Sequence, residues 1–140
     1  MEGKKTFEIE IDEANLSTEL ATHAAKMVFV AEEAVRAQLA YDQFKLKVAE
    51  LAAAIDMEAR REAEEAGKKI TEKMVENRVA CDENYKKAST HLLGLKAHAE
   101  MLKARREAWR ERGAMLVQLS SNKRAEMDAY SYDTVRAEAA

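Results

Sequence analysis

The chain contains no proline, and its four glycines are the only other strong helix breakers in 140 residues. Proline ends or kinks a helix because it lacks an amide proton and its ring clashes with the preceding turn. The composition is that of long helices and helical bundles, with 47% apolar, 35% charged and only 6% aromatic residues. We therefore predict an all-α fold. A chain of this length has room for one core of ordinary size, so we expect residues 1–140 to form a single helical domain.

Periodicity predicts a long antiparallel helical hairpin. The expected elements are a first long helix over residues 12–66, a short connecting helix over 71–79, a second long helix over 82–128 and a disordered tail over 132–140. Asp12 or Asn15, then Thr71, and then Asp82 can cap the three helix starts by accepting free backbone amides. The charged stretch that ends in Gly67 is expected to form a frayed helix end and a turn.

The first long helix carries two apolar stripes at steps of three and four residues. One stripe comprises Leu20, Ala24, Met27, Ala31, Ala34, Tyr41, Val48, Ala52 and Ile55. The other comprises Val28, Val35, Leu39, Leu46, Ala49 and Ala53. A partner helix of the same chain can cover only one stripe, so the other predicts contact with further subunits in a homo-oligomer.

The second long helix carries one apolar stripe on a seven-residue pattern. Its members are Tyr85, Ala88, Leu92, Leu95, Ala99, Leu102, Trp109 and Leu116. Gly94 and Gly113 lie within this helix, and we expect them to permit close contact with a neighbouring helix rather than to end it.

Residues 1–11 are expected to form an extended N-terminal arm. Polar and apolar residues alternate from Lys5 to Ile11, which places Phe7, Ile9 and Ile11 on one face of a short strand. A single strand needs a partner, so this strand would pair between subunits or lie against a helix. The alternative is a partly ordered arm.

The sequence offers no catalytic signature. His23, His91 and His98 are the only imidazoles, and the last two are seven residues apart, too far to share one metal ion without further ligands. Phosphate-binding loops, dinucleotide-binding turns and nucleophile elbows are absent. The single Cys81 excludes an internal disulfide and fits a reducing cytoplasm, and no apolar run reaches the roughly 18 residues of a membrane span. We expect a soluble cytoplasmic protein that is not an enzyme and has no cofactor or metal.

Charge is unevenly distributed along the chain, although the formal net charge is only −3. Residues 1–60 carry a net charge of −5 and residues 61–140 a net charge of +2. Residues 86–124 hold ten Lys or Arg against three acidic residues, a net charge of +7. A concentrated basic surface of this kind is typical of proteins that bind phosphates.

Two basic clusters are candidate DNA-binding sites. The turn cluster comprises Arg60, Arg61, Lys68 and Lys69, and the tryptophan cluster, around the only tryptophan, comprises Lys103, Arg105, Arg106, Arg110 and Arg112. Lys and Arg bind phosphates with salt-dependent affinity, and an aromatic ring can stack on an unpaired base, so the pattern favours single-stranded DNA. The alternative is that both clusters are solvated helix faces, with Glu107 and Glu111 pairing at helical spacing and Trp109 in the core.

Four segments carry a family resemblance. They are residues 69–76, Asp82 with Tyr85, residues 107–119 and residues 124–127, to which Ile11-Asp12 followed by Leu16 and Glu19 can be added. In this order and spacing the chain resembles the UvsY-like recombination mediators of phages. The likeness covers most of the chain, at a similar total length.

The resemblance implies a phage protein in the cytoplasm of the infected host that forms a homo-oligomeric ring and binds single-stranded DNA. It further implies that the protein loads a RecA-type recombinase onto DNA coated by single-strand-binding protein, in DNA recombination, repair and replication. In this family a Lys-Ala-Arg-Leu stretch before the central turn is associated with DNA binding. The nearest match is residues 58–61, where Glu58 replaces the lysine while Arg60 and Arg61 keep positive charge.

Two other functions are compatible with the sequence. A structural or scaffolding oligomer would also be free of proline and built of long helices, but it would not require the basic stretch. A regulatory adaptor would use the same helices to bind one protein partner.

Overall fold

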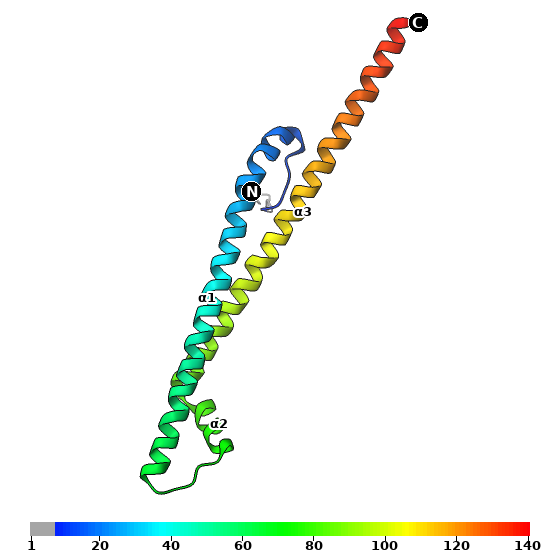
Figure 1. The fold of residues 1–140 in the computed structure, drawn as a ribbon. Coiled ribbons are helices and arrows are strands. Elements are labelled where there is room, and N and C mark those ends of the chain that lie inside the picture. Colours follow the sequence, from blue (N-terminus) through cyan, green and yellow to red (C-terminus); the bar gives the residue numbers. More distant parts are fainter. Residues whose placement is uncertain (1–7) are drawn as a thin grey trace, which may run out of the picture. The chain divides into compact units, whose positions relative to one another are not determined.

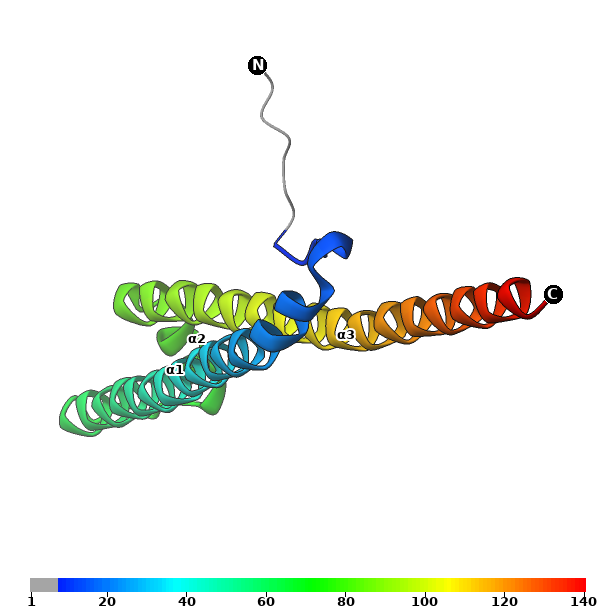
Figure 2. The same ribbon diagram turned by 90° about the horizontal axis from the view of Figure 1, so that it is seen from above.

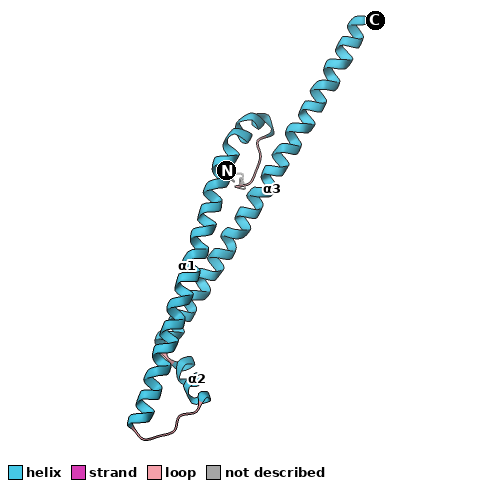
Figure 3. Cartoon of the chain, viewed as in Figure 1, coloured by secondary structure: helices cyan, strands magenta, loops and turns pink. Residues whose placement is uncertain are grey.

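The structure, a computed structural model, describes residues 8–140, and every regular element in that range is helical (Figure 1). A short 3-10 helix η1 (Glu13–Asn15) leads into α1 (Leu16–Glu65), which is followed by α2 (Glu72–Cys81) and α3 (Glu83–Ala139). Figure 3 shows that loops are confined to the N-terminal segment and to the short connections on either side of α2. The predicted all-α class and the order long, short, long helix are confirmed.

The chain divides into two compact units that share the two long helices. The terminal unit comprises Met1–Glu32 and Lys103–Ala140, and the central unit comprises Glu33–Leu102. Within each unit a segment of α1 and a segment of α3 pack together and run in opposite directions, as the colours of Figure 1 and the second view in Figure 2 show. In the central unit α2 lies beside the end of α1.

The predicted apolar stripes separate into a buried and an exposed set. All eight members of the α3 stripe are buried or half-buried, and Trp109 is only 4% exposed. Most of the first α1 stripe is likewise covered, with Ala34 and Val48 buried. All six members of the second α1 stripe are exposed, including Leu39 at 54% and Leu46 at 67%. One stripe of α1 therefore remains without a partner helix in the described part of the chain.

The helix starts are capped largely as predicted. The Asp12 carboxylate accepts the amide of Ala14 at 3.1 Å, so it caps η1 directly before α1. Thr71 Oγ1 accepts the amide of Met74 at 3.2 Å at the start of α2, and Asp82 Oδ1 accepts the amide of Tyr85 at 2.9 Å at the start of α3. Each cap satisfies a backbone amide that has no partner within the helix.

The end of α1 is ordered, contrary to the prediction of a frayed end. Gly67 takes a positive φ of 65°, which is accessible to glycine without strain. In this conformation the amide of Lys68 donates to the carbonyl of Ala63 at 2.9 Å and the amide of Gly67 donates to that of Glu64 at 3.0 Å. These are the two hydrogen bonds of a glycine-terminated helix end, and they satisfy carbonyls that fraying would expose.

Two predictions for the chain ends were wrong for the residues that the structure describes. The predicted disordered tail, residues 132–140, is helical through Ala139, because no glycine or proline follows Gly113 and the tail is rich in good helix formers. The predicted strand is absent from residues 8–11, which form a turn and an irregular segment. The carbonyls of Ile9 and Glu10 accept hydrogen bonds from the Arg112 side chain instead. Phe7 and the rest of the predicted strand lie outside the described residues.

The two glycines inside α3 have different surroundings. A Cβ added to Gly113 would lie 2.6 Å from Nε2 of His23, whereas a Cβ added to Gly94 would have no neighbour within 4 Å. The predicted close helix contact is therefore confirmed for Gly113 in the terminal unit and does not occur at Gly94.

We expect the two Gly→Ala substitutions in α3 to have opposite effects on stability. Gly94→Ala should raise the free energy of unfolding by up to about 1 kcal/mol, because alanine is the better helix former. Gly113→Ala gains the same propensity but must displace the His23 ring, so it should be less stable than Gly94→Ala by more than about 1 kcal/mol. Urea unfolding of both variants measures the difference, and equal stabilisation would show that the contact is not tight.

Candidate nucleic-acid interface

Arg112 is the centre of a buried polar network in the terminal unit. Its side chain is 3% exposed and forms an ion pair with the Glu19 carboxylate. Its Nε donates to the carbonyl oxygen of Ile9 and its Nη2 to that of Glu10, both at 3.1 Å, and its Nη1 lies 3.3 Å from Nδ1 of His23. The guanidinium is therefore satisfied by protein groups and is not exposed to a DNA phosphate. Arg112 was predicted to belong to the DNA-binding surface, because sequence alone does not distinguish a buried arginine from an exposed one.

Trp109 lies next to this network with its ring covered on several sides. The Arg112 Cζ atom is 5.0 Å from the centroid of the ring, and the His23 ring centroid is 5.8 Å away. The Lys26 ammonium of α1 lies 6.0 Å from the same centroid. The prediction that Trp109 belongs to the core is confirmed, but the cations around it show that its π-face is an electrostatic partner as well.

Glu8 connects the N-terminal segment to Arg105 and Trp109. Its Oε1 accepts from Nε of Arg105 at 2.8 Å and from Nε1 of Trp109 at 3.2 Å, and Oε2 accepts from Nε of Arg105 at 3.1 Å. Nη2 of Arg105 forms a further short contact with Oε1. The hydrogen bond from Arg105 is the main reason that the pKa of Glu8 lies below its ordinary value, and the hydrogen bond from Trp109 adds to it.

A cavity of about 500 Å³ opens beside Trp109. Its walls include Lys26 and Phe29 from α1, Arg105 and Trp109 from α3, and Glu8 of the N-terminal segment. The volume is in the range of small-ligand pockets, and the walls combine two aromatic rings with two cations. We refer to it as the Trp109 pocket, defined by Lys26, Phe29, Arg105 and Trp109.

The tryptophan cluster divides between opposite faces of α3. Successive residues of a helix are rotated by about 100°, so Arg105, Trp109 and Arg112 share one face, toward α1 and the N-terminal segment. Lys103, Arg106 and Arg110 share the other face. The cluster thus does not form one continuous ring of cations around Trp109.

On the outer face the charges are only partly neutralised. Glu107 lies 3.0 Å from Arg110 and 3.6 Å from Arg106, and Lys103 is exposed and has no ion pair within residues 8–140. Nε of Arg106 is buried without a hydrogen-bond partner among the described residues. Lys103 and Arg110 remain exposed enough to meet a phosphate.

The arginines of the turn cluster belong to the central unit and are held by acids. Arg60 pairs with Asp56 at 2.7 Å and with Glu72 of α2 at 2.8 Å, which raises the pKa of its guanidinium. Arg61 pairs with carboxylates three and four residues away, Glu58 and Glu65. Glu58 and Glu65 therefore neutralise Arg61.

Lys68 and Lys69 lie in the exposed loop after α1 and form no ion pair within the described part of the chain. They are the cations of the turn cluster that a phosphate can reach most easily.

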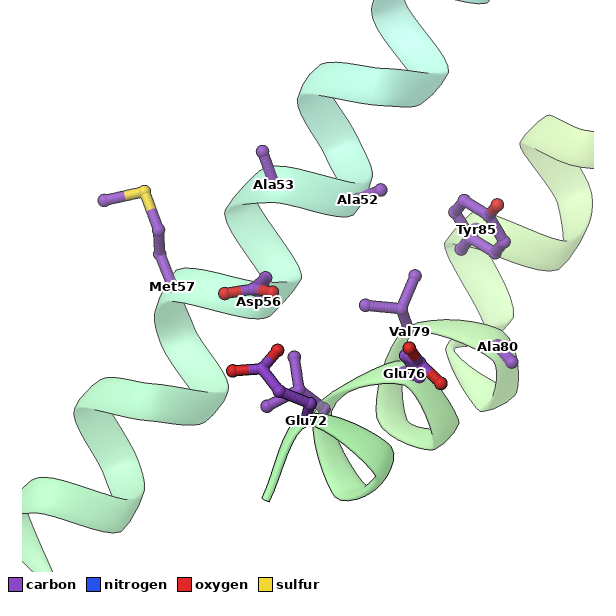
Figure 4. Close-up of a pocket in the computed structure, with 10 residues that line it drawn as sticks. Ala52, Ala53, Asp56, Met57, Glu72, Glu76, Val79, Ala80 and Tyr85 are labelled. Atoms are coloured by element: carbon purple, nitrogen blue, oxygen red, sulfur yellow. The ribbon is translucent and has the colours of Figure 1, made fainter. Parts of the chain in front are cut away.

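The hollow in the central unit is acidic. Figure 4 shows Asp56 of α1 and Glu72 of α2 close together, with Ala52 on the α1 side of the hollow and Val79 and Tyr85 on the opposite side. Its volume is about 500 Å³, but its lining residues include no Lys or Arg to bind a phosphate, and the Arg60 that pairs with Asp56 and Glu72 is already occupied by them. The Trp109 pocket is thus the better candidate for nucleic acid.

Lys26 and Phe29 were missed by the sequence analysis. Both lie on α1, about 80 residues before Trp109 in the chain, and only the packing of α1 against α3 in the terminal unit brings them to it. One feature of the sequence could have drawn attention to Lys26, which is the only Lys or Arg between Lys5 and Arg36.

Comparisons with protein-family models, curated proteins and solved structures find no match to this chain. No helix within residues 8–140 combines the length and apolarity needed to cross a membrane. The same residues contain no group of three or more His, Cys, Asp or Glu side chains that could hold a metal ion.

Protonation of His23 should destabilise the terminal unit. Burial, followed by the nearby charge of Arg112, lowers the pKa of His23 below its ordinary value of 6.5, while Glu19 partly opposes and Lys26 adds to this effect. Between the folded pKa and about 6.5 the unfolded chain binds more protons, so the free energy of unfolding should fall as the pH is lowered through this window.

We expect His23→Gln to reduce this dependence, as measured by urea unfolding at pH 7.5 and 5.5. His98→Gln, at an exposed site in the central unit, is the control and should keep the wild-type dependence. If both variants retain the full loss of stability at pH 5.5, another group is responsible.

Proposed function

We propose that this protein is a non-catalytic single-stranded DNA-binding protein of the recombination-mediator type. One observation carries the proposal: the Trp109 pocket combines the rings of Phe29 and Trp109 with the cations of Lys26 and Arg105 around one cavity. Proteins that bind single strands use this combination, because unpaired bases stack on aromatic rings while Lys and Arg follow the backbone.

The surroundings of the pocket support a path for a strand. Phe29 is 55% exposed, so its ring can take a base without unfolding the core. Lys103 and Arg110 are exposed on the opposite face of α3, so they can bind further phosphates only of a strand that passes around the helix. Lys68 and Lys69 of the central unit are additional candidates for phosphate contacts.

The mediator role rests on the family resemblance together with this surface. Each subunit would bind a few phosphates with modest affinity, and a homo-oligomeric ring would multiply that affinity by engaging one strand at several points. A strand held in this way would be loosened from single-strand-binding protein and presented to a RecA-type recombinase. The resemblance implies that these steps would occur in the cytoplasm of a phage-infected cell.

We predict that the protein binds an oligo-dT strand at low salt. The double substitution Lys26→Gln and Phe29→Ala should weaken this binding by about tenfold or more, because stacking of one base contributes about 1–3 kcal/mol. The logarithm of the binding constant falls linearly with the logarithm of the salt concentration, and loss of one phosphate contact should make this slope shallower by about 0.7. Fluorescence anisotropy at two or more salt concentrations measures both effects.

The matched control for this experiment removes a cation and an exposed apolar side chain from α1 away from the pocket. Lys47→Gln combined with Met57→Ala does so in the central unit and should bind like the wild type. Failure of the wild type to bind at low salt, or equal losses in both double variants, would contradict the proposal.

A structural or scaffolding oligomer is the second candidate function, and the exposed α1 stripe favours it. Val35, Leu39 and Leu46 lie at steps of four and seven residues and are each more than half exposed, at 60%, 54% and 67%. Such a stripe is the usual contact surface between helices of different subunits. Assembly is common to both candidate functions, so only DNA binding separates them.

We expect the wild-type protein to have a mass well above the 15.8 kDa of one chain in light scattering. Leu39→Gln combined with Leu46→Gln should shift it toward the monomer, because both substitutions make the stripe polar. Ala40→Gln combined with Lys47→Gln alters exposed positions one residue further on, beside the stripe, and should leave the assembly intact. A wild-type monomer would contradict assembly through this surface.

A further inference from the structure

Two segments of the terminal unit have opposite charges. They are the N-terminal segment, taken as residues 8–19, and residues 103–124 of α3. Residues 8–19 contain five acidic residues and no basic one, while residues 103–124 contain seven basic residues and two acidic ones. Two ion pairs join them directly, Glu8 with Arg105 and Glu19 with Arg112. The Glu19–Arg112 pair is buried, so Glu8 is the acidic residue of this segment that lies at the surface proposed to bind a polyanion.

Glu8 makes the contacts that a phosphate would make. Both carboxylate oxygens accept from Nε of Arg105, at 2.8 and 3.1 Å, and Oε1 also accepts from the Trp109 indole at 3.2 Å. The guanidinium fork binds carboxylates and phosphates with the same bidentate geometry. Glu8 lines the Trp109 pocket together with Lys26 and Phe29.

We propose that Glu8 occupies the position of a DNA phosphate on Arg105 and Trp109, so that the N-terminal segment is an intramolecular competitor of single-stranded DNA. This inference rests on the proposed function and adds a regulatory contact to it. A bound strand replaces the Glu8 carboxylate with a phosphate, and the pocket beside Trp109 becomes open to a base.

The local structure allows Glu8 to leave without loss of the fold. The Glu8 side chain is 48% exposed, and ion pairs at exposed positions contribute little net stability. The next two residues are held differently, because the carbonyls of Ile9 and Glu10 accept hydrogen bonds from the buried Arg112. The Glu8 side chain can therefore leave Arg105 while Ile9 and Glu10 keep their hydrogen bonds to Arg112.

A competitor of this kind favours long strands over small anions. A mononucleotide or inorganic phosphate must displace Glu8 with one or two charges, whereas a strand gains further phosphate contacts at neighbouring cations. A polyanion should therefore displace Glu8 from Arg105, whereas a small anion should not.

The test compares Glu8→Gln with Glu13→Gln by anisotropy of a labelled oligo-dT strand at low salt. Both substitutions remove one negative charge from the same acidic segment, but Glu13 is exposed in η1, does not line the Trp109 pocket and forms no ion pair with Arg105 within residues 8–140. Glu8→Gln should bind about fivefold more tightly than the wild type, the factor expected for loss of one exposed ion pair. Glu13→Gln should change affinity less than about twofold, the effect of a distant screened charge. Adding Arg105→Gln to Glu8→Gln should remove the gain.

The outcomes separate this inference from the proposed function. Wild-type binding that is unchanged or weakened by Glu8→Gln overturns the competitor but leaves DNA binding intact. An equal gain in Glu8→Gln and Glu13→Gln overturns it too, because the effect would then be one of net charge. If neither the wild type nor any variant binds, the proposed function fails and the competitor fails with it.

Discussion

The terminal unit depends on the buried guanidinium of Arg112. A charge removed from water is tolerated only when it is paired and its donors are satisfied. Arg112 meets this condition with the Glu19 carboxylate, the backbone carbonyls of Ile9 and Glu10, and the ring of His23. The same contacts decide where the N-terminal segment lies and hold Glu8 beside the Trp109 pocket. Gly113, the next residue in α3, supplies the close approach that brings His23 within reach.

Much of the fold could be predicted from the sequence because local chemistry determines it. The absence of proline permits the long helices, and Thr71 and Asp82 cap helices where their side chains suggested. The apolar stripe of α3 was identified correctly because periodicity reports burial. The tail over residues 132–140 was predicted to be disordered, although several of its residues favour a helix and α3 runs through Ala139.

The candidate site was harder to predict because its residues come from distant parts of the chain. Lys26 and Phe29 meet Trp109 only through packing, and Glu8 meets Arg105 across 97 residues. Arg112 could not be distinguished from the exposed arginines near it, because the sequence does not show whether an arginine side chain is buried. The five cations around Trp109 were predicted as one cluster, although helical geometry divides them between two faces of α3. This division separates a pocket that can take a base from exposed cations that can bind only phosphates. Whether the chain acts on DNA or only assembles depends on that pocket.

The most direct test uses Trp109 itself, because it is the only tryptophan in the chain. Its emission should be recorded during titration with an oligo-dT strand at low and at high salt. If a strand occupies the Trp109 pocket, the emission changes saturably at low salt, and the change disappears as salt screens the phosphate contacts. An emission that stays constant while anisotropy shows the strand to be bound would contradict the central claim, because DNA would then bind elsewhere on the protein.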